Sequence, residues 1–297
     1  MLRRTIVVFA ALFAAVTVVP FGDAATPKFP VTVHAANGDV VIKQRPTRIV
    51  SLSPTATEDL FAVGAGPQVV AVDQDSDYPK GVPTTSLSGY TPNAEAIATY
   101  NPDLVVVSGD GGIVAQLGKL GITVLLEPAA DNLAQAYDEV RQFGTATGHS
   151  DAATKLVRSM ETRITGLIRS VPRAARHLKV FHELSPDLYS ATSSTFIGRI
   201  YKLFGFRNIA DAADPAHTGY PKLSAEYVVE QSPDIVVLSD SVCCGQTAKT
   251  VAGRPGWQNV SAVRKGRVIA VNDSIASRWG PRIVDFVRFV AQVAKRS

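Results

Sequence analysis

Cysteine is scarce in this chain of 297 residues, because only Cys243 and Cys244 occur and they are adjacent. The sequence also lacks a Cys-x-x-Cys pair, a His-Glu-x-x-His pair and a Gly-x-Ser-x-Gly turn, so it gives no support to a zinc enzyme or a serine hydrolase. Its five histidines are scattered, without a short metal-binding spacing. We therefore predict a protein that is not an enzyme and that has no metal site and no resident cofactor.

A large excess of charge is also missing. The formal net charge is +4, and the basic residues are dispersed rather than gathered in one stripe, which makes nucleic acid a poor candidate partner. Hydrophobic residues make up 46% of the chain and charged residues 19%. This composition is typical of a globular protein, and the length is enough for two domains that each have a core.

A long apolar run occurs only near the N-terminus. Arg3 and Arg4 precede an apolar segment over residues 5–19, and small residues follow over 20–25, which together predict a signal peptide spanning 1–24. An uncleaved membrane anchor is the competing interpretation, but this run of about 15 residues is shorter than the roughly 20 that span a bilayer. No cysteine lies there for lipid attachment. We expect an exported protein that is soluble in the periplasm or cell envelope after the signal is removed.

Two stretches of the chain follow the same plan. Residues 93–106 and 224–237 each carry a glutamate, Glu95 or Glu226, seven residues before a Pro-Asp pair that opens an apolar run. This pattern predicts a short helix, a turn and a strand that is buried on both faces. The repetition predicts two similar α/β lobes with a cleft between them.

A tyrosine also precedes each glutamate, Tyr90 five residues before Glu95 and Tyr220 six residues before Glu226. Either tyrosine alone would more often be a half-buried surface aromatic. Either glutamate alone would be explained by the helix dipole, which stabilises a carboxylate in the first turn by about 0.3–1 kcal/mol. The occurrence of both features in both lobes favours a functional role.

Strand and helix patterns alternate on both sides of a long helical segment that runs from Ser150 to Val171 and is followed by Pro172. A helix of roughly 33 Å is either a strut between two lobes or an outer helix of one sheet, and the repeated plan favours the strut. We predict an α/β fold of two lobes, each with a central, mostly parallel sheet flanked by helices, joined by a single long α-helix. The predicted boundaries are a signal peptide at 1–24, an N-terminal lobe at 25–148, a linking helix at 149–172 and a C-terminal lobe at 173–297.

The remaining elements follow from apolar periodicity and turn residues. A hairpin is expected about Asn37-Gly38, and a last helix is expected from near Pro281. Parallel strands are expected at 48–52, 69–72, 104–107, 122–125, 178–182, 235–238 and 267–271, and helices at 55–63, 93–100, 113–120, 133–147 and 196–204.

Several blocks in this order carry a family resemblance. They are residues 48–55 with Glu58, residues 70–73, the Asp77-Tyr78-Pro79 turn, the paired Pro-Asp strands, and residues 257–260 ahead of Gly266. Together they resemble the periplasmic binding proteins for vitamin B12 and iron-siderophores over essentially the whole mature chain. The resemblance implies a two-lobed receptor with a rigid linking helix, which delivers a metal chelate (corrinoid, ferric siderophore or haem) to the permease of an ABC importer.

The resemblance also assigns roles to residues of this chain. Ligand contact is implied for Tyr90 and Tyr220, which stand where relatives carry cleft tryptophans, for Arg278 and Trp279 in a cleft-facing loop, and for Ser53 and Tyr78 at the border of the cleft. Glu95 and Glu226 match the pair, one per lobe, that docks on permease arginines. The chemistry agrees, since flat aromatic walls bury a wide ligand at low entropic cost and separated carboxylates suit arginine forks.

Simpler interpretations stay open for some of these residues. Arg278 would also satisfy a nearby carbonyl, and Trp279 would also fill the core over the last helix. His217 is either a solvated loop residue or an axial ligand of a bound metal chelate. Cys243 and Cys244 form a vicinal disulfide, remain free thiols, or take part directly in ligand or metal binding.

Two other functions use the same scaffold. A receptor for a bare divalent metal would need three or four converging ligands, and an enzyme that processes a tetrapyrrole would need a nucleophile or an acid–base pair. Neither set is visible in the sequence.

Overall fold

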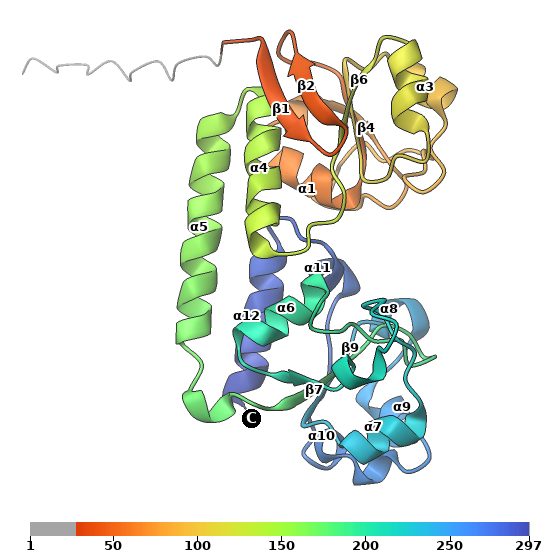
Figure 1. The fold of residues 1–297 in the computed structure, drawn as a ribbon, viewed down its shortest axis with the longest axis vertical. Helices are drawn as coiled ribbons and strands as arrows, with labels where there is room; N and C mark the ends of the chain where they lie inside the picture. Colours follow the sequence, from red (N-terminus) through yellow and green to blue (C-terminus); the bar gives the residue numbers. More distant parts are fainter. Residues whose placement is uncertain (1–27, 297) are drawn as a thin grey trace, which may run out of the picture.

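The computed structural model describes residues 28–296, which form two α/β lobes and a group of long helices along one side of both (Figure 1). The predicted signal peptide lies outside the described residues. None of the described helices combines the length and the apolar character that crossing a membrane requires.

The N-terminal lobe is built on a parallel sheet of order β4-β3-β5-β6. The two inner strands are buried along their whole length, which explains their uninterrupted apolar sequence. The strands are β3 (Ile49–Leu52), β4 (Val69–Val72), β5 (Leu104–Val107) and β6 (Thr123–Leu126), and the helices are α1 (Pro54–Ala62), α2 (Ala94–Ala98), α3 (Ile113–Lys119) and α4 (Leu133–Thr147). The predicted hairpin is present as β1 (Val31–Ala35) and β2 (Gly38–Ile42), with Val31 opposite Ile42.

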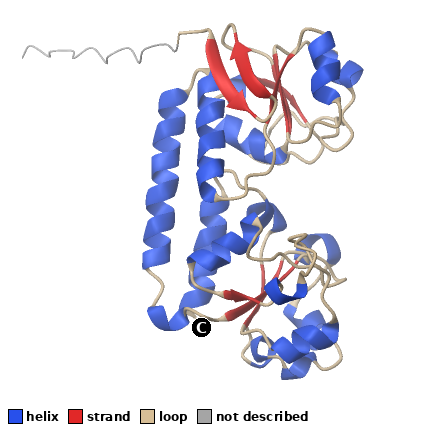
Figure 2. Cartoon of the chain, in the orientation of Figure 1, coloured by secondary structure: helices blue, strands red, loops and turns tan. Residues whose placement is uncertain are grey.

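The C-terminal lobe repeats this arrangement with a parallel sheet of order β10-β9-β7-β8 (Figure 2). Its strands are β7 (Lys179–Glu183), β8 (Arg207–Asn208), β9 (Ile235–Leu238) and β10 (Val268–Ala270). Its helices are α6 (Phe196–Leu203), α7 (Ala225–Gln231), α8 (Ser241–Cys244), α9 (Ala248–Ala252), α10 (Ser261–Arg264), α11 (Asp273–Ser277) and α12 (Ile283–Lys295). Short 3-10 turns occur at Gly66–Gln68, Arg173–Ala175, Asp211–Ala213 and Trp257–Asn259.

Helix α5 (Ser150–Arg169) connects the lobes, which confirms the predicted linking helix. It runs beside α4 and α12 from one lobe to the other (Figure 1). Its 20 residues span about 30 Å. The buried face consists of Ala153, Val157, Met160 and Ile164.

Helix α12 joins this helical layer to the C-terminal sheet. Its Phe286 ring meets the His182 ring of β7 edge to face, with the centroids 6.3 Å apart. The same helix packs on α5, so the core is continuous from the C-terminal sheet through α12 and α5 to α4. The lobes are therefore tied by packing as well as by the chain itself.

Parts of the C-terminal lobe were not predicted. The segment around Cys243 and Cys244 was expected as a loop, but it forms the short helix α8, and helices α9, α10 and α11 and strand β8 were missed. These elements have two to five residues each, which is too short for an apolar period to stand out.

Candidate functional site

Two cavities open between the lobes, where the carboxyl ends of the two sheets face each other. One has a volume of about 570 Å³ and the other about 550 Å³, and both are lined by Ser277 and Trp279. The shared lining makes them two halves of one cleft, with Trp279 between them. A cleft at the carboxyl ends of parallel strands is the usual ligand site of open α/β sheets.

Tyr90 lines the first cavity from the N-terminal lobe, and 88% of its surface is exposed. Its turn is held by Ser88, whose hydroxyl oxygen accepts hydrogen bonds from the backbone N–H groups of Tyr90 (3.2 Å) and Thr91 (3.1 Å). Only glycine fits at position 89, because a Cβ there would lie 2.6 Å from the carbonyl oxygen of Leu52. The turn is thereby pressed against the end of β3, and Tyr90 projects from it.

Tyr220 lines the second cavity from the C-terminal lobe and is 49% exposed. The Asp214 carboxylate holds its loop by accepting hydrogen bonds from the backbone N–H groups of Thr218 (2.9 Å) and Gly219 (2.7 Å). The Thr218 hydroxyl in turn accepts from the Tyr220 N–H at 3.2 Å. Each lobe therefore presents one tyrosine on a loop that side-chain hydrogen bonds fix in place.

The other predicted ligand residues differ in their placement. Ser53 lines the first cavity, but it is buried and its hydroxyl caps α1 by accepting from the Ala56 N–H at 3.4 Å. Tyr78 lies outside both cavities, in a separate hollow, where the Arg282 guanidinium stands 4.1 Å from the centre of its ring. His217 lines the second cavity beside Tyr220.

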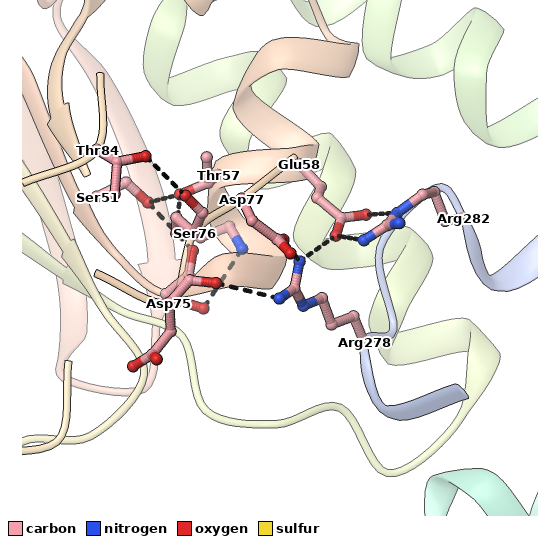
Figure 3. Close-up of polar contacts among 11 residues, drawn as sticks. Ser51, Thr57, Glu58, Asp75, Ser76, Asp77, Thr84, Arg278 and Arg282 are labelled. Carbon is pink, nitrogen blue, oxygen red and sulfur yellow. Dashed lines mark hydrogen bonds and ion pairs between the residues drawn. The ribbon is translucent and has the colours of Figure 1, made fainter. Parts of the chain in front are cut away.

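The loop before α12, which carries Arg278 and Arg282, is bound to the N-terminal lobe by ion pairs (Figure 3). Arg282 donates to both carboxylate oxygens of Glu58, at 2.5 and 2.9 Å. Arg278 donates to Glu58 at 3.1 Å, to Asp77 at 2.6 Å and to the carbonyl oxygen of Asp75 at 3.1 Å. Arg278 thus lines the first cavity while most of its donors are taken by the N-terminal lobe.

Three buried acids lie near one another in the N-terminal lobe, and one of them contacts Trp279. Its indole N–H donates to Glu139 at 2.7 Å, and burial raises the pKa of Glu139 to about 8 although this hydrogen bond lowers it. Burial also raises the pKa of Glu127 to about 7. The pKa of Asp59 is raised well above its usual value, first by burial and then by the nearby Glu139 and Glu58. These carboxyl groups therefore hold protons more tightly in the folded protein than in the unfolded chain.

Replacing Glu139 by Gln is expected to weaken the fall in stability with rising pH. Between about pH 4.5 and 8 the folded state binds a proton at Glu139 that the unfolded state has released, so wild-type stability falls as the pH rises through this window. Glutamine stays neutral and still accepts from Trp279. Relative to the wild type, the variant should gain roughly 3 kcal/mol in unfolding free energy between pH 5 and pH 8.5.

Urea unfolding at these two pH values measures the effect. Asp138→Asn is the matched control, since Asp138 lies next to Glu139 on α4 but is exposed, and its pH profile should follow the wild type. If the unfolding free energies of Glu139→Gln and the wild type changed equally between these two pH values, the raised pKa assigned to Glu139 would be wrong.

Glu95 and Glu226 occupy equivalent places in the two lobes. Each is the second residue of its helix, α2 or α7, after an N-cap side chain, Asn93 or Ser224, that accepts a backbone N–H. Both glutamates are exposed, and within residues 28–296 neither forms an ion pair. Their carboxylates are thus free to meet a partner, and the docking role stays a prediction.

Cys243 and Cys244 form a disulfide in the last turn of α8. This outcome selects one of the three alternatives that the sequence left open. Across the described part of the chain, no group of three or more metal-ligating side chains gathers in a metal-binding arrangement.

Sequence reasoning missed several residues of the cleft. Asp73, Asp273 and Ser274 line the first cavity, and Asp131 and Thr195 line the second. Asp73 belongs to a block that carried the family resemblance, so a signal existed for it. Asp273 and Ser274 begin the short helix α11, and Asp131 and Thr195 lie in loops, so nothing in a single sequence marks their position.

Comparison with known proteins identifies the architecture. A family model described as periplasmic binding protein matches residues 49–274. The chain belongs to the periplasmic binding protein family. The two lobes and the linking helix are the fold that this periplasmic binding protein shares with its solved neighbours.

Curated relatives and solved structures agree with this family. An uncharacterized ABC transporter substrate-binding lipoprotein, YvrC of Bacillus subtilis, is 34% identical over 278 residues, which are 90% of this chain and 86% of YvrC. A cobalamin-binding protein of Halobacterium salinarum is 32% identical over 267 residues, 86% of this chain and 72% of that protein. The periplasmic vitamin B12 binding protein BtuF of Vibrio cholerae has a TM-score of 0.69 and 25% identity, covering 84% of this chain and 96% of BtuF. The periplasmic haem binding protein HutB of the same organism has a TM-score of 0.74 and 25% identity, covering 83% and 98%.

Proposed function

We propose that this periplasmic binding protein carries a metal chelate outside the cytoplasm and delivers it to the permease of an ABC importer. One observation carries the proposal: Tyr90 and Tyr220, from opposite lobes, line the two halves of a cleft that share Trp279. Relatives named for cobalamin and haem have the same fold, and those ligands are wide, flat and partly apolar. Aromatic side chains suit such a ligand because they bury large area with few rotors to freeze.

The chemistry of the cleft favours a chelate over a bare ion. Its lining contains aromatic rings, hydroxyl groups and a few carboxylates. The cavities of about 570 and 550 Å³ have room for a bulky organic ligand. Arg278, which lines the first cavity, is held by Glu58 and Asp77, so its orientation is set before a ligand arrives. Preformed walls reduce the entropic cost of binding.

Titration followed in the visible region tests the proposal. Purified protein is titrated with cyanocobalamin, haemin and a ferric hydroxamate, each of which absorbs visible light. Saturable one-to-one binding of at least one probe is expected. Absence of binding by all three, or chemical conversion of a bound probe, would overturn the proposal.

Replacing either cleft tyrosine is expected to lower the affinity for the probe. Tyr90→Ala and Tyr220→Ala each remove an aromatic wall, and each should raise the dissociation constant about tenfold. Tyr189→Ala is the matched control, because Tyr189 is 44% exposed in the C-terminal lobe but lines neither cavity. Equal effects from all three variants would show that the tyrosines do not form the site.

A further inference from the structure

The helical turn formed by Val242, Cys243 and Cys244 is the part of the molecule that the proposed function leaves unexplained. Val242 is 72% exposed, and both cysteines are exposed although their disulfide is apolar. A hydrophobic residue and a disulfide at the surface of one short turn form an unusual patch. We call these three residues the disulfide turn.

The order of the strands places the disulfide turn on the sheet edge that borders the cleft, beside the two cavities, although none of its three residues lines either of them. Strand β9 lies between β10 and β7, and all three are parallel. The segment after β10 is α11, whose Asp273 and Ser277 line the first cavity, and the residue after β7 is Leu184, which lines the second. The disulfide turn follows β9, so it rises from the middle of the same sheet edge. Figure 1 shows α8 on the side of the C-terminal lobe that faces the N-terminal lobe.

The internal repeat leads to the same placement. Glu95 and Glu226 are equivalent, and the same offset aligns β5 with β9 and Ser108 with Ser239. Ser108, directly after β5, lines the first cavity. In the N-terminal lobe this segment continues into glycines, whereas in the C-terminal lobe it continues into the disulfide turn. The two equivalent segments therefore differ, and the apolar one belongs to the C-terminal lobe.

Buried polar contacts hold the disulfide turn from below. The carbonyl oxygen of the fully buried Asp240 accepts a hydrogen bond from the Cys244 N–H at 3.1 Å. On the other flank, the Gln246 side chain accepts from Arg254 at 2.8 Å. Arg254 is itself fixed by a bidentate ion pair with Glu183, at 2.6 and 2.7 Å. These contacts fix the disulfide turn to the ends of β7 and β9.

We propose that the disulfide turn is a ligand contact, in which Val242 and the oxidised cysteine pair form an apolar ledge against one face of the bound chelate. The inference rests on the proposed function and adds a third wall to it. A bond between neighbouring cysteines closes a small ring, which removes side-chain rotors and both S–H donors. The ledge is therefore rigid and apolar only while the pair is oxidised.

Reduction provides a reversible way to change the ledge without a mutation. Dithiothreitol transfers two electrons and two protons to the S–S bond, which gives two thiols, and dithiothreitol becomes its own cyclic disulfide. The freed side chains rotate and expose polar S–H groups. Reduced protein should therefore bind the chelate more weakly, and reoxidation should restore the affinity.

The test measures the affinity for cyanocobalamin and haemin with four preparations besides the oxidised wild type. They are wild type reduced and then freed of dithiothreitol under argon, the Cys243→Ala/Cys244→Ala double variant, Val242→Ser, and Val41→Ser. Val41 is the matched control, because it is 52% exposed on β2, away from the cleft. The first three should bind the better probe about five- to tenfold more weakly, as expected for losing a small apolar contact, and Val41→Ser should match the wild type.

The other outcomes separate the inference from the proposed function. Unchanged affinity in the first three preparations would overturn the ledge, while binding by the wild type would leave the proposed function standing. Unchanged affinity together with lost uptake in cells would assign the disulfide turn to the importer interface instead. If the wild type bound neither cyanocobalamin nor haemin, this inference would be overturned. If it also did not bind a ferric hydroxamate, the proposed function would be overturned as well.

Discussion

Reversing the charge of Glu95 and Glu226 together is expected to abolish uptake while the affinity for ligand stays at the wild-type value. Each carboxylate is exposed in the first turn of a helix, and neither lines the cleft cavities. In the proposed docking, one acid on each lobe would meet an arginine of the permease, which would give a rigid two-point contact. Two lysines in these places would set like charges against each other, which costs several kcal/mol at an interface.

Uptake of the radiolabelled probe, in cells whose own copy carries Glu95→Lys and Glu226→Lys, measures this effect. It should fall to below about a tenth of the wild type. Asp151→Lys is the matched control, because Asp151 also lies exposed in a first helical turn, that of α5, and loses the same helix-dipole interaction. Normal transport by the double variant would remove the docking assignment, and lost ligand binding would show that the substitutions disturb the lobes themselves.

Glu58→Ala is expected to cause the largest loss of stability among the single substitutions. The Glu58 side chain is 1% exposed and pairs with both Arg278 and Arg282 across the lobes. Its removal leaves two largely buried guanidinium groups without their shared carboxylate, and breaking a buried pair in this way costs about 3–5 kcal/mol. The substitution also removes the repulsion between Glu58 and Asp59, which would stabilise the variant. This gain is the smaller effect, because the pKa of Asp59 is raised mainly by burial.

Urea unfolding at neutral pH measures this loss. Asp285→Ala is the matched control, because its pair with Arg288 also involves α12 but is about 40% exposed, and its loss should cost no more than about 1 kcal/mol. Equal costs for the two variants would show that the Glu58 contacts do not hold the lobes together.

The fold was largely predictable because its long elements carry strong periodic signals. Helix α4 occurs at the predicted residues, and α5 ends within two residues of the predicted Val171. The buried strands β5 and β9 stand out because the chain repeats their plan. The missed helices α9 to α11 are short, and contacts with the lobe determine them more than local preference does.

The site was less predictable because it depends on contacts between distant segments. The sequence marked Arg278 and Trp279 as cleft residues through the family resemblance, but it gave no sign that they reach Glu58 and Glu139, which lie more than 100 residues away. It also did not separate Tyr78, which faces Arg282 in another hollow, from Tyr90. Side-chain partners of this kind follow from the folded arrangement of the lobes.

The central claim is that the chelate binds between the tyrosines of the two lobes. Anomalous diffraction at the cobalt or iron edge, from crystals grown with the probe that binds, locates the metal directly. The account predicts one strong peak in the cleft, between Tyr90 and Tyr220 and over Trp279. A peak at another surface, with the cleft filled only by solvent, would contradict it.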